Sequence, residues 1–285
     1  MTIRTVQHII QSVPTSDGAG VKLRRSLGVR GFRHDPFLML DEFSSDNPND
    51  YIAGFPAHPH RGFETVTYLI DGHMLHQDHM GNRGDLKSGG VQWMTAGRGV
   101  IHSEMPQQLE GRMRGFQLWV NLPAKEKMKP ASYRDIDPSE VPVVEIERGR
   151  VKVIAGTFES GTRRVEGAVR SSATDVSYFD VELQPGAVFS QAVAETHNAF
   201  IYVFEGAATV GPAGDTRQIE THTGAVLSGG DEIRVEAGAN GARFLLLGGR
   251  PLNEPVVQYG PFVMNTRDEI EQAIRDYQSG ELARA

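Results

Sequence analysis

Histidines are concentrated in one part of this chain. The sequence contains ten of them, and six lie between positions 58 and 102. Two pairs in this window, His58-Pro-His60 and His102-Ser-Glu104, place potential metal ligands two residues apart. Side chains at positions i and i+2 of an extended strand point to the same face. If the two pairs occupy neighbouring strands of a barrel, three imidazoles and one carboxylate converge inside it.

Nitrogen and oxygen ligands of this kind suit a divalent transition metal. Three neutral imidazoles and one carboxylate favour Fe(II), Mn(II), Co(II), Ni(II) or Cu(II), and the chain has no cysteine that could supply a soft thiolate. Four protein ligands on a six-coordinate ion leave two positions for water, oxygen or substrate, which is typical of a reactive metal. An isolated His-x-His usually means surface histidines, but the second pair favours the metal.

The other histidines are interpreted differently. His73, His76 and His79 follow a glycine at the start of a stretch rich in Gly, Asn and Asp. We expect them to be solvated loop or strand residues, with support of the metal ligands from behind as the alternative. His197 and His222, in the second half of the chain, are expected to be structural or surface residues.

Short strands must position the ligands. Glycine is frequent, at 32 of 285 residues, and it ends short apolar runs such as 66–70 and 200–204. Many β-branched and aromatic runs separated by turn residues predict an all-β sandwich or barrel. A helix is predicted only from about 267 to 279, where Thr266 and Glu269 have the spacing of a capping box.

The chain divides into two similar halves around residues 123–142, which are rich in proline and charge. The strand–turn segment 68–72 (Tyr-Leu-Ile-Asp-Gly) matches 202–206 (Tyr-Val-Phe-Glu-Gly), and each is followed by a Ser-Gly-Gly turn. Matching segments in the same order predict a duplicated β-barrel. We expect an N-terminal metal-binding domain over 1–135 and a second domain over 136–285 that ends in the helix.

The second half serves as an internal control for the ligands. Carried forward by the same offsets, the four ligand positions fall on residues that are not metal ligands: Ala192, Ala194, Arg243 and Leu245. We therefore expect one metal per chain, in the first half.

Composition excludes several classes of protein. Without cysteine there is no disulfide scaffold, zinc finger or cysteine nucleophile. The formal net charge of −7 argues against direct nucleic-acid binding. Apolar runs are far shorter than the roughly 20 residues of a membrane span. Residues 1–13 lack a basic region followed by an apolar one, so we expect no secretory signal and a cytoplasmic location.

Longer shared strings show that the chain resembles the pirin family of bicupins over nearly its whole length. The similarity is carried by His58-Pro-His-Arg-Gly-Phe-Glu-Thr-Val-Thr-Tyr68 and by Ile101-His-Ser-Glu-Met-Pro106. The remaining matching segments are 35–43, 92–99, 116–123, 197–203 and 251–256.

This resemblance implies two cupin barrels (double-stranded β-helix, jelly-roll-like) with one metal in the N-terminal barrel. The family's ligands fall on His58, His60, His102 and Glu104, and iron is the usual metal. Pirins also resemble quercetin 2,3-dioxygenases in activity, which implies cleavage of a flavonol-like aromatic substrate with O2. The family differs from ordinary cupins at Glu64, which the general cupin pattern would make a ligand.

If the chain is an enzyme, its ligands need a substrate pocket around them. Glu104 is expected to bind the metal or to accept the substrate's hydroxyl proton. The candidate pocket residues flank the motifs or share a strand face: Phe55, Arg61, Phe63, Met94, Gln117 and Trp119. Ordinary core packing is the alternative for the apolar ones, and a surface ion pair is the alternative for Arg61.

The resemblance also implies a non-enzymatic alternative, a metal- and redox-sensing regulator that binds a partner protein, either a transcription factor or a metabolic enzyme. Its docking surface could be a basic patch in the connecting stretch, with a solvated linker as the alternative. The patch residues are Lys125, Lys127, Lys129 and Arg134.

Overall fold

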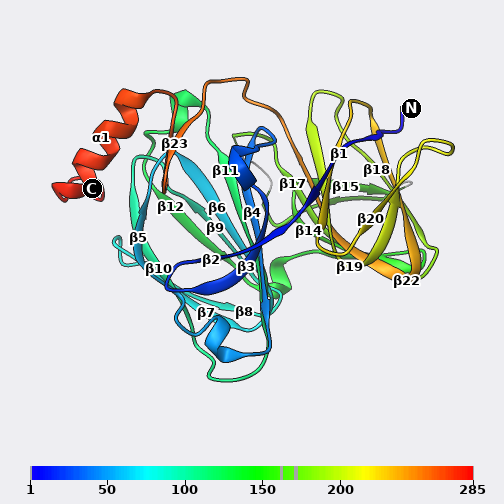
Figure 1. Cartoon of the computed structure of the whole chain (residues 1–285), viewed down its shortest axis with the longest axis horizontal. Coiled ribbons are helices and arrows are strands. Elements are labelled where there is room, and N and C mark those ends of the chain that lie inside the picture. The colour runs from blue at the N-terminus through cyan, green and yellow to red at the C-terminus, as the bar shows by residue number, and fades with distance from the viewer. Residues whose placement is uncertain (1, 161–162, 170–172, 285) are drawn as a thin grey trace. The chain divides into compact units, whose positions relative to one another are not determined.

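The chain folds mostly into β-strands, as its short apolar runs predict. The computed structural model describes residues 2–160, 163–169 and 173–284, which contain 24 strands and one α-helix (Figure 1). In this described part, no helix combines the length and the apolar character needed to span a bilayer. Two compact units result. The histidine unit comprises Pro14–Gly31, Phe37–Pro138 and Leu252–Ala285, and the apolar unit comprises Met1–Val13, Phe32–Pro36 and Ser139–Pro251.

Two antiparallel sheets form the histidine unit. The larger has the strand order β12-β9-β6-β11-β4-β3-β2, and the smaller has the order β5-β10-β7-β8. The strands are β2 (Val13–Asp17), β3 (Val21–Leu27), β4 (Phe37–Ser45), β5 (Phe55–His60), β6 (Phe63–Asp71), β7 (His73–Asp78), β8 (Arg83–Lys87), β9 (Val91–Thr95), β10 (Val100–Pro106), β11 (Met113–Asn121) and β12 (Ser132–Ile136). The order of the smaller sheet makes β5 and β10 neighbours, so the two ligand pairs lie on adjacent strands.

The apolar unit repeats this topology. Its sheet has the order β1-β21-β19-β22-β17-β14-β13, while β18 pairs with β22, β20 pairs with β19, and β15 forms a separate ribbon with β16. The strands are β1 (Val6–Gln11), β13 (Val143–Ile146), β14 (Gly149–Ala155), β15 (Thr157–Ser160), β16 (Arg163–Glu166), β17 (Ser177–Leu183), β18 (Val188–Ala192), β19 (Asn198–Val210), β20 (Arg217–Glu220), β21 (Thr223–Leu227) and β22 (Glu232–Gly249). A cluster of buried aliphatic and aromatic side chains fills its interior. The shared strand order confirms two barrels of one design.

The ends of the chain depart from the expected division at 135/136. Strand β1 pairs antiparallel with β21 in the apolar unit, with Ile9 opposite Ala225, and there takes the sheet edge that β12 takes in the histidine unit. Conversely, the C-terminal segment Leu252–Ala285 belongs to the histidine unit. Both departures come from backbone pairing between residues far apart in sequence. Local sequence patterns do not predict such pairing.

The C-terminal segment contains a hairpin, β23 (Val257–Tyr259) with β24 (Phe262–Met264), and the helix α1 (Arg267–Gln278). Thr266 accepts a hydrogen bond from the Glu269 backbone N–H, and the Glu269 carboxylate accepts one from the Thr266 backbone N–H, which confirms the capping box. The buried face of α1 contributes Ile270 and Ala273 to a cluster with the hairpin. The helix prediction is confirmed within one residue at its end.

Candidate functional site

Three of the four expected ligands come together where β5 meets β10. The strands pair antiparallel, with His58 opposite His102 and His60 opposite Val100. One ring nitrogen from each of His58, His60 and His102 lies within 4.8 Å of the other two. His60 and His102 are buried and His58 is half-buried. The i, i+2 spacing in β5 therefore places both of its imidazoles on the side of the sheet to which His102 points.

The nitrogens of this cluster are arranged as ligands. His58 Nδ1 lies 2.8 Å from the Pro56 carbonyl, which only accepts, so Nδ1 carries the proton and Nε2 keeps its lone pair. That Nε2 lies 3.0 Å from His60 Nε2. Two facing lone pairs repel, so a shared proton or a metal ion must lie between them. The separation of 3.0 Å between the two Nε2 atoms also matches two ligand nitrogens at right angles around an ion with metal–nitrogen bonds of about 2.1 Å.

Burial keeps the imidazoles of His60 and His102 neutral. It lowers the pKa of His60 well below the usual value, with a further lowering by the neighbouring His58. It lowers the pKa of His102 in the same way, helped by His60 and His58. His102 Nε2 is buried and has no hydrogen-bond partner in the described part of the chain. An unpartnered buried nitrogen beside two further imidazoles fits a divalent metal.

Glu104 is placed beside this cluster and is held by another residue. A register shift in the β5–β10 pairing separates it from His102. Its Oε1 lies 2.8 Å from Thr67 Oγ1 on β6, which lies 2.6 Å from Gln117 Oε1 on β11. A hydroxyl has one proton, so Thr67 donates to the carboxylate while the Gln117 amide, with its oxygen and nitrogen exchanged, donates to Thr67. The carboxylate is thus oriented by a two-residue hydrogen-bonded chain.

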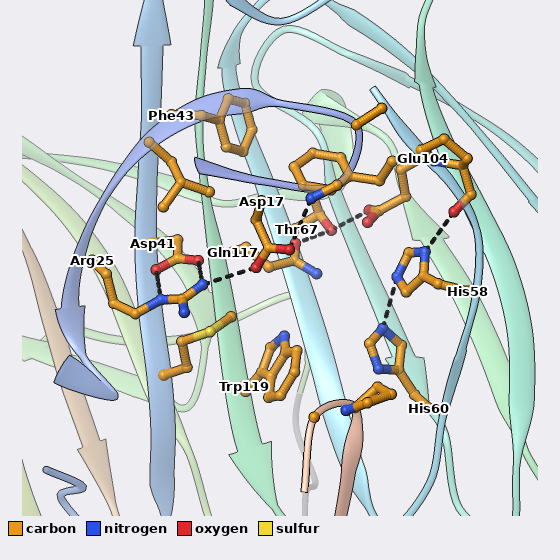
Figure 2. A pocket seen from close by; sticks show the side chains of 18 of the residues that line it. Asp17, Arg25, Asp41, Phe43, His58, His60, Thr67, Glu104, Gln117 and Trp119 are labelled. Atoms are coloured by element: carbon orange, nitrogen blue, oxygen red, sulfur yellow. Dashed lines mark hydrogen bonds and ion pairs between the residues drawn. The ribbon is translucent and has the colours of Figure 1, made fainter. Parts of the chain in front are cut away.

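The cluster opens into a cavity of about 710 Å³ inside the histidine unit. Figure 2 shows His58, His60 and Glu104 on one side of it, with Asp17, Arg25 and Asp41 facing them. Its apolar walls are formed by Leu23, Met39, Phe43, Phe55, Met74 and Trp119. A cavity of this size, mostly apolar with a few convergent polar groups, is typical of a small-molecule site.

Comparison with known proteins identifies the family. The Pirin family profile matches residues 20–120, and the Pirin C-terminal cupin domain matches residues 178–283. The chain belongs to the pirin family.

Relatives of this pirin include proteins with enzyme names and proteins without them. A Pseudomonas aeruginosa protein named "Putative quercetin 2,3-dioxygenase" is 55% identical over 98% of both chains. Human Pirin is 43% identical over 93% of this chain and 89% of its own. The crystal structure of quercetin 2,3-dioxygenase from Acinetobacter baumannii superposes with a TM-score of 0.89 at 36% identity, covering 99% of each chain. A pirin from Escherichia coli in complex with nickel(II), with a TM-score of 0.63 at 18% identity over 86% of this chain and 98% of its own, shares the fold.

Three of the six expected pocket residues line the cavity, namely Phe55, Gln117 and Trp119. The other three do not line the cavity, because a residue next to a ligand motif in sequence need not lie on the cavity-facing side of its strand. Phe63 packs against the rings of Trp119 and His60, with 4.3 Å and 5.1 Å between ring centroids, without lining the cavity, and Met94 packs in a separate cluster with Val100.

Arg61 is a structural residue in this pirin. Its guanidinium forms a 2.7 Å ion pair with Asp276 of α1, and it also donates to the Arg98 carbonyl. Its side chain is 5% exposed, so the alternative of an ion pair holds, although the pair is largely buried. Glu64 lies away from the cluster: its Oε1 accepts from Thr95 Oγ1 at 2.7 Å, and burial raises its pKa. The structure is therefore consistent with the pirin pattern, in which this glutamate is not a ligand.

An ion-paired group in the cavity wall was missed from the sequence. Arg25 on β3 binds both oxygens of the buried Asp41 on β4, at 2.7 Å each, and its Nη2 also lies 3.0 Å from Asp17. Both carboxylates raise the pKa of Arg25, so it stays charged. Arg25 and Asp17 belong to no motif, and Asp41, although it lies in the matching segment 35–43, meets Arg25 only because β3 pairs with β4.

The histidines after Gly72 divide into two kinds. His73 pairs at the surface with Asp85, and His79 Nδ1 accepts from the Ile101 backbone N–H at 3.2 Å. His76 is 1% exposed and stacks on Tyr133, with 4.3 Å between ring centroids. The expectation of a solvated residue is therefore wrong for His76.

Lys127 is not part of a basic surface patch. Its ammonium is buried and donates to the Gly62 carbonyl at 2.7 Å, the Asn121 side chain at 2.5 Å and the Val263 carbonyl at 3.0 Å. Burial lowers its pKa to about 8. Lys129 is half-buried and pairs with Glu126, which leaves only Lys125 and Arg134 of the expected patch exposed.

Proposed function

We propose that this pirin is a metal-dependent dioxygenase that cleaves a flavonol such as quercetin with O2. The observation that carries the proposal is the three-histidine cluster, which opens into a 710 Å³ cavity with an acceptor carboxylate, Glu104, in the same wall. The enzyme names of the P. aeruginosa and A. baumannii relatives support it.

The proposed ligands are His58, His60, His102 and Glu104, holding one divalent ion. Fe(II) is our first candidate, and Mn(II), Co(II), Ni(II) and Cu(II) are alternatives that the same donor set accepts. The bound ion would supply Lewis-acid chemistry, lowering the pKa of a substrate hydroxyl.

Glu104 is proposed to receive the proton of that hydroxyl. An ionised carboxylate can accept hydrogen bonds at both oxygens. Thr67 donates to Oε1, which leaves Oε2 with acceptor capacity in a group that lines the cavity. Gln117 supports Thr67 from behind and so keeps the carboxylate facing the cavity.

The cavity walls favour a flat, donor-rich substrate. Phe43, Phe55 and Trp119 provide aromatic surfaces for a ring system. Opposite the histidines, Asp17 and Asp41 share the single positive charge of Arg25. A wall with more carboxylates than cations accepts hydrogen bonds from phenolic hydroxyls and repels an anionic substrate. We therefore propose a neutral polyphenol rather than a carboxylic acid.

The test is turnover by metal-loaded protein. The chain is loaded separately with Fe(II), Mn(II), Co(II), Ni(II) and Cu(II), supplied with quercetin under oxygen, and followed by the loss of quercetin's visible absorbance. Glu104→Gln keeps the shape of the side chain and should lower kcat by about 100-fold or more, the usual contribution of a general base. Absence of turnover with all five metals would refute the flavonol substrate.

The basic docking patch expected for the regulator alternative is weakened by the structure. This patch contains a buried lysine, Lys127, and a paired one, Lys129. A partner protein that co-purifies with the chain, and whose affinity changes with the metal's oxidation state, would favour the regulator over the enzyme.

A further inference from the structure

His76 is a buried histidine that the proposed chemistry does not use. It lies on β7, next to β10, and its Nδ1 is 3.3 Å from Nδ1 of His102. Its ring is fixed in place by stacking on Tyr133, at 4.3 Å between centroids and 21° between planes. On the far side, its Nε2 lies 3.7 Å from Asp78 Oδ2, and both side chains are buried.

We propose that Asp78 and His76 set the tautomer of His102 and so position its Nε2 as a metal ligand. The proposal rests on the metal site proposed above. Asp78 and His76 are positioning residues in it, because they act through His102 and do not contact the ion.

The buried carboxylate of Asp78 is the fixed end of this chain of contacts. Asp78 is anchored in its turn: Oδ1 accepts from the backbone N–H groups of Met80 and Asn82, and Oδ2 accepts from the Asn82 side chain. At 3.7 Å the His76–Asp78 contact is longer than a hydrogen bond, so the carboxylate acts through its charge. A negative charge favours a proton on the nearer nitrogen of His76, Nε2, and disfavours a lone pair there.

A neutral imidazole with its proton on Nε2 has a lone pair on Nδ1. In His76 this lone pair faces His102 Nδ1. Two facing lone pairs repel, so His102 carries its proton on Nδ1 and donates it to His76. His102 Nε2 is then left with a lone pair, on the atom that has no partner among the described residues.

The chain His102–His76–Asp78 extends the carboxylate–histidine–metal arrangement by one imidazole. Partners of this kind fix a ligand's tautomer and ring orientation, and their removal typically lowers metal affinity by about 10- to 100-fold. His58 is fixed in the same sense by the Pro56 carbonyl, so two ligands are oriented independently of the metal.

The first measurement needs no metal. In the metal-free chain with 15N-labelled histidine, long-range proton–nitrogen spectra should show His102 protonated on Nδ1 and His76 on Nε2. A spectrum with the His102 proton on Nε2 would overturn the proposal. This measurement uses the wild-type chain and so does not depend on a variant that folds.

The second measurement is Ni(II) affinity by chelator competition. His76→Phe keeps the stack on Tyr133 and removes the acceptor, so Ni(II) should bind about 10- to 100-fold more weakly. His76→Asn places an amide oxygen near the position of Nδ1 and should recover most of the affinity. His73→Phe changes the surface histidine at the start of the same strand and should bind Ni(II) like the wild type.

The two proposals can fail separately. Equal Ni(II) affinity of His76→Phe and the wild type would overturn the role of His76, whatever the turnover of quercetin. Weakened binding by His76→Phe with recovery in His76→Asn would support it, even if no metal form of the wild type consumed quercetin.

Discussion

Corresponding strands of the two barrels carry a row that is polar in one barrel and apolar in the other. In the smaller sheet of the histidine unit, one row across three strands consists of His58, His102 and Asp78. The corresponding strands of the apolar unit are β18, β22 and β19, and their row consists of Phe189, Val235 and Val210. All three of these apolar residues belong to the buried core of their unit.

The unit that contains the histidine cluster is less completely packed than the apolar unit. The apolar row packs against its neighbours, with Phe189 in ring contact with Phe158 and Phe244. The polar row borders a cavity at His58 and contains a buried nitrogen, His102 Nε2, without a partner among the described residues. Buried polar atoms of this kind cost folding free energy unless something binds them. One unit is therefore built for packing and the other for a ligand.

The largest effect is expected from copying the apolar row into the histidine unit. His58→Phe combined with His102→Val removes two of the three clustered imidazoles, so metal content should fall from one ion per chain to none. Thermal unfolding of the metal-free chain should not occur at a lower temperature, because one half-buried and one buried polar ring give way to apolar side chains.

Mass-spectrometric metal analysis of the purified, reloaded chain measures the first outcome, and calorimetry measures the second. His73→Phe is the control, since it removes a surface histidine outside the row. A double variant that still holds one ion per chain would contradict the ligand assignment.

The reverse comparison concerns packing. Phe189→Ala should lower the free energy of unfolding by about 3–5 kcal/mol, the usual cost of a large cavity in a core, because Phe189 is 2% exposed. Urea unfolding measures this, and Ni(II) affinity should be unchanged. Val188→Ala, at a neighbouring side chain that is 45% exposed, should change the free energy by less than about 0.5 kcal/mol. Equal effects of the two variants would mean that the apolar row does not carry the packing.

A smaller effect is expected at Lys127, a buried amine whose hydrogen bonds in the described part of the chain go to two backbone carbonyls and the Asn121 side chain. Its pKa is lowered from 10.5 to about 8 in the folded chain. Between these pH values the unfolded chain holds the proton and the folded chain does not, so stability rises with pH through this window. At about 1.4 kcal/mol per pKa unit, the full rise amounts to about 3 kcal/mol.

Lys127→Met should lose this rise. Urea unfolding of both chains at pH 7.5 and pH 10 measures it, and the wild type minus the variant removes the titration of other groups. A difference that stays constant across the two pH values would show that Lys127 titrates at its ordinary pKa.

The sequence predicted what depends on local spacing. Alternation and glycine punctuation predict strands, a capping box predicts α1, and the i, i+2 spacing predicts that His58 and His60 share a face. Each of these patterns lies within a few residues of the chain.

What the sequence did not predict depends on pairing between distant strands. His76 reaches His102 only because β7 pairs with β10, and Arg25 reaches Asp41 only because β3 pairs with β4. Sequence proximity was only partly informative at Phe63, which follows the first ligand pair and contacts His60 but does not line the cavity. The sequence offsets between the two halves placed the counterparts of His102 and Glu104 at Arg243 and Leu245. These are not the structural counterparts, because both residues lie in the part of β22 that pairs with β17 and not in the part that pairs with β18.

The smallest effect is expected from the negative charge of Asp17 in the cavity of the histidine unit, since the interior of the apolar unit is filled by side chains. Asp17 lines the cavity, its side chain is 54% exposed, and it shares Arg25 with Asp41. Asp17→Asn keeps its shape and removes one negative charge. An exposed charge contributes about 0.2–1 kcal/mol, so KM for quercetin should rise about two- to fivefold while kcat is unchanged.

A carboxylate-bearing flavonol provides the sharper measurement, because its KM should fall in the same variant as the repulsion from the cavity wall weakens. Asp46→Asn, at an exposed aspartate outside the cavity lining, is the matched control and should leave both KM values unchanged. If Asp17→Asn moved both KM values in the same direction, the cause would be a change of cavity shape, and the proposed selection of neutral polyphenols by charge would be wrong.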